Sequence, residues 1–280
     1  MTQQPTPSQI GARRADFRKL HEAGCFLIPN PWDVGSARYL ASLGFKALAS
    51  TSSGWAWSLG ERDGGPPLEA VLAHLRQLVA ATELPVNADF EHGFAAEPEG
   101  VARNVRLAID TGIAGLSIED STGDPATPLF DLPLAVERMR AARAAIDASG
   151  EDVMLIGRAE NFVAGRPDLQ DAIGRLQAYA EAGADCLYAP RITDPEIISR
   201  IVKAVAPKPV NALMVSPVPG LTFSRLADLG VRRISVGSAL SRVALGAFIR
   251  AAQDILTTGN FDTLGDAAPF KDLNDIFSQQ

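Results

Sequence analysis

Short runs of strand-forming residues alternate along this chain with longer stretches whose apolar positions recur at helical spacing. Eight such runs predict strands, at residues 25–30, 45–50, 85–90, 115–120, 153–160, 184–190, 209–214 and 232–238. Helices are predicted between and after them, at 34–44, 68–82, 99–112, 132–150, 168–183, 194–206, 222–230 and 239–256. Parallel strands need a crossover long enough to hold a helix, so each strand and its helix form one β-α unit. Eight units predict an α/β fold, the (β/α)8 TIM barrel, with functional groups at the carboxyl ends of the strands.

The two ends of the chain fall outside this repeat. No composition break or linker divides the rest, so we expect one barrel domain over residues 1–256, including a polar leader (1–15), and a helical extension over 257–280. The extension could fold back on its own barrel or dock on a neighbouring subunit. It has apolar residues that need cover, namely Phe261, Leu264, Phe270, Leu273, Ile276 and Phe277.

Composition narrows the class of function. A hydrophobic content of 46% is that of an ordinary globular chain, and a net charge of −7 makes nucleic acid an unexpected partner. Cys25 and Cys186 form neither a disulfide framework nor a cysteine metal site, which fits a reducing compartment. The chain shows no signal peptide and no apolar run of about 18 residues, so we expect a cytoplasmic protein without a membrane partner.

Carboxylates gather at the ends of the third and fourth strands. Asp89 and Glu91 are two residues apart, so strand alternation is expected to place both on one side and Phe90 on the other. Glu119 ends the next strand. Three carboxylates in a partly dry cavity call for a cation, and Mg²⁺ suits them because it takes oxygen ligands and keeps several waters. Asp63, in the loop after the second strand, could join through water; the alternative is a solvated acidic rim without metal.

Other strand ends supply groups that could bind a substrate. Arg158 ends the fifth strand, where its planar fork could hold a carboxylate, or could pair internally with Glu160. Ser53 and Gly54 follow the second strand, where backbone N–H groups could bind an oxyanion. Asn211, on the seventh strand, is a further substrate-binding candidate.

The three histidines are too few and too scattered for a histidine metal site. His21, in a helix that follows from the leader, and His74, in the predicted helix 68–82, are expected at the surface. His92 follows the third strand directly and is a candidate acid or base, or a solvated loop residue.

Taken in order, these residues resemble the isocitrate lyase/phosphoenolpyruvate mutase superfamily, over about residues 17–256. The family's D-A-D-T-G-Y-G after the third strand is matched by acids at the same spacing in D-F-E-H-G, and its I-E-D and A-R-T-D/E motifs recur after the next two strands. The matching positions are Ser53-Gly54, Leu59-Gly60-Glu61-Arg62-Asp63, Asp89 and Glu91 before Gly93, Ile118-Glu119-Asp120 and Gly157-Arg158-Ala159-Glu160.

The resemblance implies a Mg²⁺-dependent enzyme, with Mn²⁺ as an alternative metal, that forms a pyruvate-like enolate from a 2-oxo or 2-hydroxy carboxylate. It makes Asp89 the direct metal ligand, with waters held by Asp63, Glu91 and Glu119. Ser53 and Gly54 would contact the oxo acid, Arg158 would hold the other end of the substrate, and Glu119 and His92 join Arg158 as catalytic candidates. The resemblance also implies a homotetramer, a dimer of dimers, in which the last barrel helix is exchanged between subunits.

One departure from the family bears on the reaction. Lyases of the family have K-R-C-G-H on the loop after the fourth strand, with the cysteine as the acid, whereas residues 121–129 here include no cysteine, histidine or lysine. Decarboxylation of the oxaloacetate type needs no such acid, because carbon dioxide leaves without a proton, and retro-aldol cleavage with another acid also remains open. The alternatives are phosphorus–carbon chemistry, as in mutases and phosphonopyruvate hydrolases, and a barrel that binds oxo acids without turnover.

Overall fold

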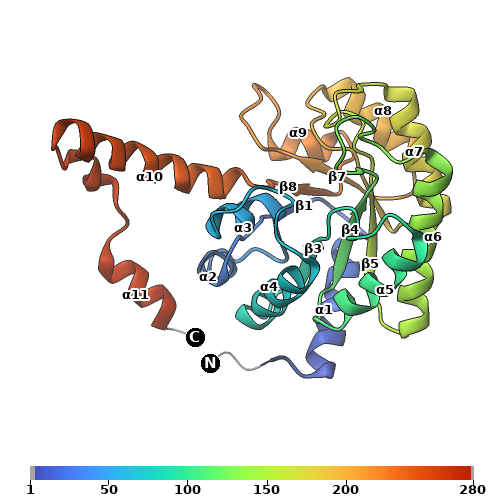
Figure 1. Ribbon diagram of the computed structural model, residues 1–280, viewed down its shortest axis with the longest axis horizontal. Helices are drawn as coiled ribbons and strands as arrows, with labels where there is room; N and C mark the ends of the chain where they lie inside the picture. Colours follow the sequence, from blue (N-terminus) through green and yellow to red (C-terminus); the bar gives the residue numbers. More distant parts are fainter. Residues whose placement is uncertain (1–3, 279–280) are drawn as a thin grey trace.

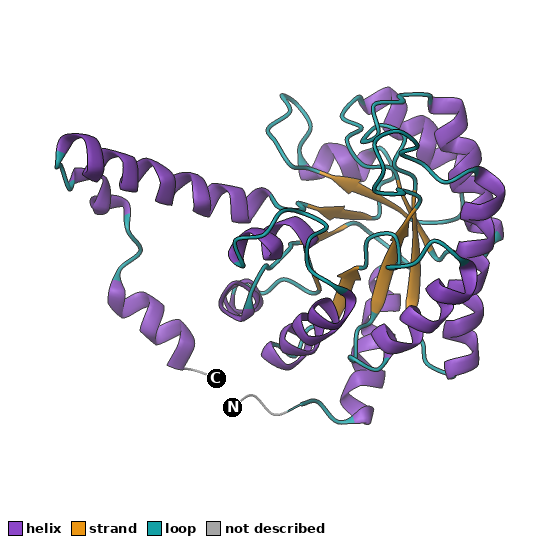
Figure 2. Ribbon diagram, viewed as in Figure 1, coloured by secondary structure: helices purple, strands orange, loops and turns teal. Residues whose placement is uncertain are grey.

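The computed structural model describes residues 4–278, and its centre is a parallel sheet rolled into a barrel (Figure 2). The strands pair in the order β1-β8-β7-β6-β5-β4-β3-β2. Between β1 and β2 the Ala49 N–H donates to the Pro29 carbonyl at 3.0 Å, which brings the two edges together. The predicted TIM barrel is confirmed. Its strands are β1 (Phe26–Ile28), β2 (Leu48–Ala49), β3 (Val86–Asp89), β4 (Gly115–Glu119), β5 (Met154–Arg158), β6 (Cys186–Tyr188), β7 (Val210–Leu213) and β8 (Arg233–Ser235).

Helices surround the sheet, and every predicted helix is present (Figure 1). Seven of these and one addition cover the barrel: α2 (Val34–Ser42), α3 (Ser52–Ser58), α4 (Leu68–Ala81), α5 (Pro98–Ile109), α6 (Leu132–Ser149), α7 (Leu169–Glu181), α8 (Pro195–Val205) and α9 (Phe223–Asp228). The addition is α3, a short helix that begins where we expected a loop. Thr51 starts it, because its side-chain oxygen accepts the Gly54 N–H at 3.3 Å.

The polar leader forms the first part of a helix. Helix α1 (Pro7–Leu20) lies across the amino end of the barrel, where Phe17 is fully buried among interior residues such as Ile28 and Met154. Arg14 is also buried and forms an ion pair with Glu151. This end of the barrel is therefore plugged, and the opposite end is left to build a site.

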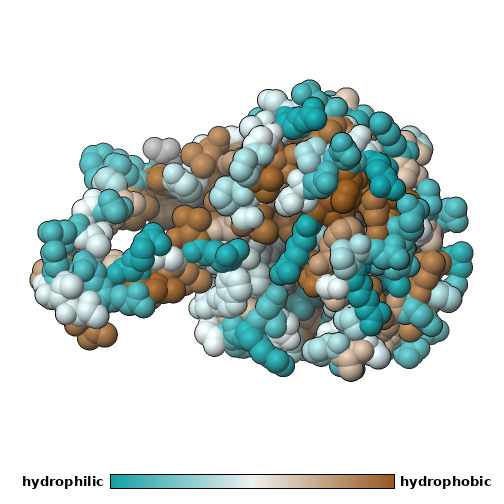
Figure 3. All heavy atoms as spheres, turned by 90° about the horizontal axis from the view of Figure 1, so that it is seen from above, coloured by the Kyte–Doolittle hydropathy of each residue, from teal (hydrophilic) through white to brown (hydrophobic). Residues whose placement is uncertain are grey.

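The C-terminal extension is the least covered part of the structure. Helix α10 (Ala239–Thr258) projects from the barrel, and a 3₁₀ turn, η1 (Asp262–Asp266), leads to α11 (Phe270–Ser278), which returns to contact α2 (Figure 1). Only Ser241 of α10 is buried, whereas Val243, Phe248 and Leu256 are 69%, 68% and 85% exposed. Apolar residues therefore lie open along the projecting arm (Figure 3).

Strand β1 also has an uncovered position. Leu27 of β1 is 38% exposed, although a barrel strand normally has a helix over its outer face. No helix within residues 4–278 is long and apolar enough to cross a membrane.

Candidate active site

A cavity of about 760 Å³ opens at the carboxyl ends of the strands. It is within the size range of small-molecule sites and lies at the end of the barrel where such enzymes place their chemistry. Five carboxyl groups line it, from Asp63, Asp89, Glu91, Glu119 and Glu160. The structure therefore brings together all four acids that the sequence nominated as metal ligands and adds Glu160 to them.

Asp89 ends β3 and is held on both sides by the backbone and side chains of the second unit. Its Oδ2 accepts the Ser52 N–H at 3.0 Å, and its own N–H donates to Ser50 Oγ at 2.8 Å. Its Oδ1 lies 3.2 Å from Nη1 of Arg158. The carboxylate is thus fixed in place at the centre of the acidic cluster.

Glu91 reaches the cavity by a different route from the one expected. Strand β3 ends at Asp89, and Glu91 lies beyond it in a left-handed turn with φ of 47° while Phe90 is fully buried. A turn, and not strand alternation, therefore places both acids in the cavity. Burial, with the nearby Asp89 and Asp63, raises the pKa of Glu91 to about 8.

Arg158 is the central cation of the cluster. Its Nη1 lies 3.1 Å from Glu119 and 3.2 Å from Asp89, its Nε pairs with Glu160, and its guanidinium stands 5.1 Å from the ring centre of Tyr188. The internal pairing with Glu160 that we weighed against substrate binding is therefore present. Burial raises the pKa of Glu119, and Arg158 opposes the shift.

This donor set fits a hard divalent cation. Within residues 4–278, no three histidine, cysteine or acidic side chains are already grouped as ligands around one point. Mg²⁺ does not need such a group, because it binds through one or two carboxylates and keeps its other waters. Asp89 offers a carboxylate that is fixed in place, and the acids around it have pKa values raised by burial and by one another. The site therefore supplies oxygen ligands and needs a positive charge.

Two of the predicted substrate-binding residues do not line the cavity. The Gly54 N–H donates to the Thr51 side chain, which caps α3. A side chain at position 54 would press against Thr51, Trp32 and Ser241. Thr51, Ser52 and Ser53 line the cavity in its place. Asn211 is buried inside the barrel, where its amide donates to Ser235 Oγ at 3.0 Å.

His92 lies in the cavity wall, in the loop that follows β3. Burial and the nearby Arg138 lower its pKa. Arg138 is buried in α6 and donates to the carbonyls of His92, Ala95 and Ala96. This arginine shapes the loop, and its local sequence in a helix gave no sign of that role.

The other two histidines correct our expectation of surface positions. His74 is buried and stacks on Trp55 with ring centres 4.3 Å apart, and burial lowers its pKa to about 4. His21 is buried between Phe17 and Phe26, and burial together with Arg233 lowers its pKa to about 3. His74 is three residues after Val71 and four before Leu78, so the helical spacing did contain the signal.

The cavity has more arginines than the sequence indicated. Arg62, Arg191 and Arg242 line its mouth and are exposed, and Arg233 lines its depth and is buried. Arg62 and Arg191 come from loops, Arg242 from the first turn of α10 and Arg233 from β8, so only the fold brings them together.

Asp120 fixes the segment that follows β5 through hydrogen bonds. Its Oδ1 accepts the Glu160 N–H at 2.8 Å, and its Oδ2 accepts from the Tyr179 hydroxyl at 2.5 Å and from Arg175 at 3.0 Å. A buried carboxylate with three donors is fully satisfied, so it positions Glu160 and does not face the substrate.

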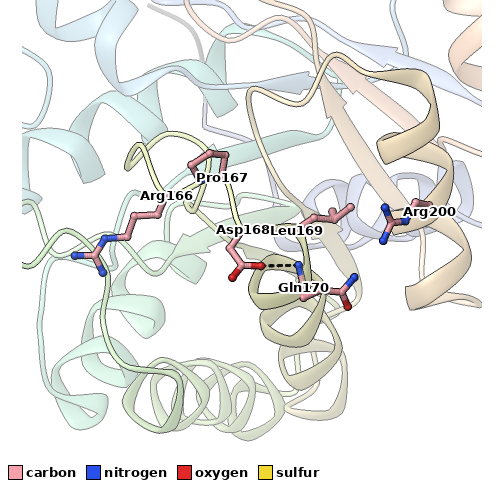
Figure 4. Close-up of a pocket in the computed structure, with 6 residues that line it drawn as sticks. All are labelled: Arg166, Pro167, Asp168, Leu169, Gln170 and Arg200. Carbon is pink, nitrogen blue, oxygen red and sulfur yellow. Dashed lines mark hydrogen bonds between the residues drawn. The ribbon is translucent and has the colours of Figure 1, made fainter.

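A second hollow lies at the start of α7, lined by Arg166, Pro167, Asp168, Leu169, Gln170 and Arg200 (Figure 4). Its one acid, Asp168, accepts the Gln170 N–H at 2.8 Å and caps the helix. Without an acidic cluster it offers no comparable chemistry, and the larger cavity remains the candidate site.

Comparison with known proteins gives a consistent set of matches. The sequence model of the phosphoenolpyruvate phosphomutase family matches residues 17–256. An uncharacterized Mycobacterium tuberculosis protein, Rv1998c, is 32% identical and the alignment covers 92% of this chain and 94% of the relative. The oxaloacetate decarboxylase of Chromohalobacter salexigens is 32% identical over 90% of this chain and 86% of its own. A crystal structure from Burkholderia cenocepacia, described as a candidate lyase/mutase, is 47% identical with a TM-score of 0.94, over 96% of this chain and 98% of that one.

Proposed function

The chain belongs to the phosphoenolpyruvate mutase/isocitrate lyase superfamily, and we propose that it cleaves a carbon–carbon bond of a small 2-oxo or 2-hydroxy carboxylate. The observation that carries this proposal is the cavity in which Asp89, Glu119 and Arg158 meet at the carboxyl ends of neighbouring strands. Breaking a carbon–carbon bond next to a carbonyl leaves an electron pair that must be stabilised. The acidic cluster would hold the cation whose positive charge stabilises that pair.

Asp89 would hold a divalent cation, Mg²⁺ or Mn²⁺, directly, and Asp63, Glu91 and Glu119 would hold its waters. When bound, the cation supplies positive charge to the oxygen of the developing enolate. Ser52 already orients Asp89 through its backbone N–H, and Ser53 lies in the cavity wall where a substrate carboxylate can reach it.

Arg158 would then exchange part of its contact with the acids for a substrate carboxylate. A planar guanidinium that already makes three acidic contacts can present two parallel donors to another carboxylate, which an ammonium cannot. His92 borders the cavity and burial favours its neutral form, so it can accept a proton from a hydroxyl and, once protonated, return that proton to the enolate carbon.

The same site supports a second candidate reaction. Arg62, Arg191 and Arg242 at the mouth are the kind of cations that a phosphonate would need, so phosphorus–carbon cleavage of phosphonopyruvate remains a candidate. It predicts release of inorganic phosphate or of a rearranged ester from phosphonopyruvate, whereas the first proposal predicts release of a 2-oxo acid from a carbon substrate.

We also propose that the chain forms a homo-oligomer through exchange of α10. The helix leaves the barrel with its apolar residues open, and Leu27 of β1 lacks a covering helix in the same chain. If α10 of one copy packs over β1 of a second copy, the apolar surfaces of the helix and of the strand are both covered.

The function is tested by following pyruvate release from oxaloacetate, and 2-oxo acid release from 2-hydroxy dicarboxylates, with Mg²⁺ and with EDTA. We expect metal-dependent release that Asp89→Ala removes and that Arg232→Met, outside the cavity, leaves unchanged. Absence of metal-dependent turnover with every 2-oxo and 2-hydroxy acid would leave a barrel that binds oxo acids without turnover.

A further inference from the structure

The proposed reaction needs a group that gives a proton to carbon. Cleavage of the carbon–carbon bond leaves an enolate, which becomes a 2-oxo acid only when its carbon is protonated. Within residues 4–278, the cavity lining includes no cysteine or lysine, and its acids would hold the cation or pair with Arg158. The titratable side chains that remain there, besides the arginines, are His92 and Tyr188. The proton donor is therefore sought between these two.

Tyr188 ends β6 and points into the barrel. It pairs in register with Arg158 on β5 and with Asn211 on β7, and its side chain packs in the interior cluster that includes Met154. The residue is 7% exposed and lines the cavity. The guanidinium carbon of Arg158 stands 5.1 Å from the centre of its ring. The phenol is therefore fixed by packing beside the group that would hold the substrate.

Arg233 lies inside the barrel, one layer below the acidic cluster, and no acid balances its charge. Ser235 follows it by two residues on β8 and lines the cavity, so both side chains point inward. Arg233 is 3% exposed, and none of the ion pairs within residues 4–278 includes it. Its Nε donates to Asn211 Oδ1 at 2.8 Å and its Nη1 to Asn87 Oδ1 at 3.4 Å. A buried cation of this kind favours a negative charge that forms nearby.

The charges around Tyr188 suit a hydroxyl that gives up its proton only briefly. Burial raises the pKa of this hydroxyl, so the phenol holds its proton at pH 7. Arg158 and a hydrogen bond with Ser235 oppose the rise, because both stabilise the phenolate. Arg233 is close enough for the phenol to affect its pKa, and it brings a second positive charge. A phenolate formed at Tyr188 would therefore lie close to two buried guanidinium groups.

His92 meets the same need less directly. In its neutral form the imidazole must take up a proton before it can give one to carbon. A 2-hydroxy acid could supply that proton from its hydroxyl, whereas a 2-oxo acid has no hydroxyl. Tyr188 has its proton in place for both kinds of substrate.

We propose that Tyr188 is the acid that protonates the enolate carbon. The O–H bond of the phenol breaks, a C–H bond forms with the electron pair of the enolate, and the phenolate then takes a proton from water. This inference rests on the proposed function for the formation of the enolate. It gives the site an acid on β6 in place of the cysteine that residues 121–129 lack.

The test follows the same proton transfer without carbon–carbon cleavage. Pyruvate is incubated with the enzyme and Mg²⁺ in D₂O, and proton NMR measures the exchange of its methyl protons above the rate with Mg²⁺ alone. Removal of a methyl proton forms the enolate, and the group that takes this proton is also the group that returns it. We expect exchange by the wild type and a loss of about a hundredfold or more in Tyr188→Phe, as for other positioned acids and bases.

Tyr39→Phe is the matched control, because Tyr39 lies on α2 and is 43% exposed. It should exchange protons at the wild-type rate. A second measurement separates proton transfer from support of the fold. Isothermal titration with oxalate, a mimic of the enolate, in the presence of Mg²⁺ should give Tyr188→Phe the wild-type dissociation constant, since the ring that packs in the barrel is kept.

Three results would overturn the proposal. They are no exchange by the wild type, wild-type exchange by Tyr188→Phe, and a weakened affinity of Tyr188→Phe for oxalate. If His92→Asn loses the exchange while Tyr188→Phe keeps it, the acid is His92. Exchange into pyruvate breaks no carbon–carbon bond, so failure of the proposed activity would be seen separately, in the turnover assay.

Discussion

Replacing Phe248 by aspartate is expected to separate the subunits of the proposed oligomer. Phe248, Leu256 and Val243 are 68%, 85% and 69% exposed along α10. Full burial of such a side chain contributes about 1.5–3 kcal/mol, so covering the exposed parts of all three contributes about 3–7 kcal/mol per helix. Phe248→Asp removes about 1–2 kcal/mol of this and adds the cost of placing a carboxylate against apolar surface, about 1–3 kcal/mol.

A twofold exchange doubles each effect, because both helices of a pair have the substitution. A loss of at least about 4 kcal/mol per pair weakens association roughly a thousandfold. Sedimentation velocity at micromolar concentration should therefore show an oligomer for the wild type and a monomer for Phe248→Asp. Leu107→Asp is the control, since Leu107 is 43% exposed on α5, away from the arm. A variant that keeps the wild-type sedimentation coefficient, or a monomeric wild type, would refute the exchange of α10.

Three further predictions concern the site and its support. Asp89→Ala should abolish metal-dependent turnover while shifting the thermal midpoint little, because it removes one charge from a crowded acidic cluster; undiminished kcat/KM would contradict the ligand role. Arg158→Lys should lower kcat/KM about tenfold to a hundredfold, since a point charge cannot replace a fork, and wild-type kinetics would reject the assignment. The pKa of His74 is about 4 in the fold against 6.5, so below pH 6.5 the unfolded chain takes up a proton that the folded chain refuses. The wild type should lose about 3 kcal/mol of unfolding free energy from this residue between pH 6.5 and 4, and His74→Phe should lose correspondingly less in urea titrations; equal losses would contradict the assignment.

The barrel was predictable because its signals are local. Runs of strand-forming residues and stretches with apolar positions at helical spacing depend only on neighbouring residues. They therefore predicted all eight strand–helix units. Helix α3 was missed because its seven residues include serines and a glycine, and its start depends on the cap by Thr51. The path of α10 away from the barrel was not decided by its sequence, since an apolar stripe does not say which chain covers it.

The sequence predicted which residues form the candidate site but not how those residues contact one another. The strand-end rule found Asp89, Glu119 and Arg158. The rule could not show that the Asn211 side chain is already hydrogen-bonded inside the barrel. Its bonds to Ser235 and Arg233 join neighbouring strands, and their register is a property of the closed sheet. The sequence placed Arg191 after the sixth strand but did not single out Arg62 or Arg242, since their position at the mouth depends on how a loop and α10 fold.

The charges of the cavity are unbalanced in opposite directions at two depths. In the upper layer several carboxylates, among them Asp89 and Glu119, share the buried guanidinium of Arg158, so the protein alone leaves an excess of negative charge there. In the lower layer Arg233 has amide oxygens and no carboxylate, so the excess is positive. The divalent cation proposed for Asp89 would relieve the upper excess, because it supplies the positive charge that the guanidinium of Arg158 alone does not.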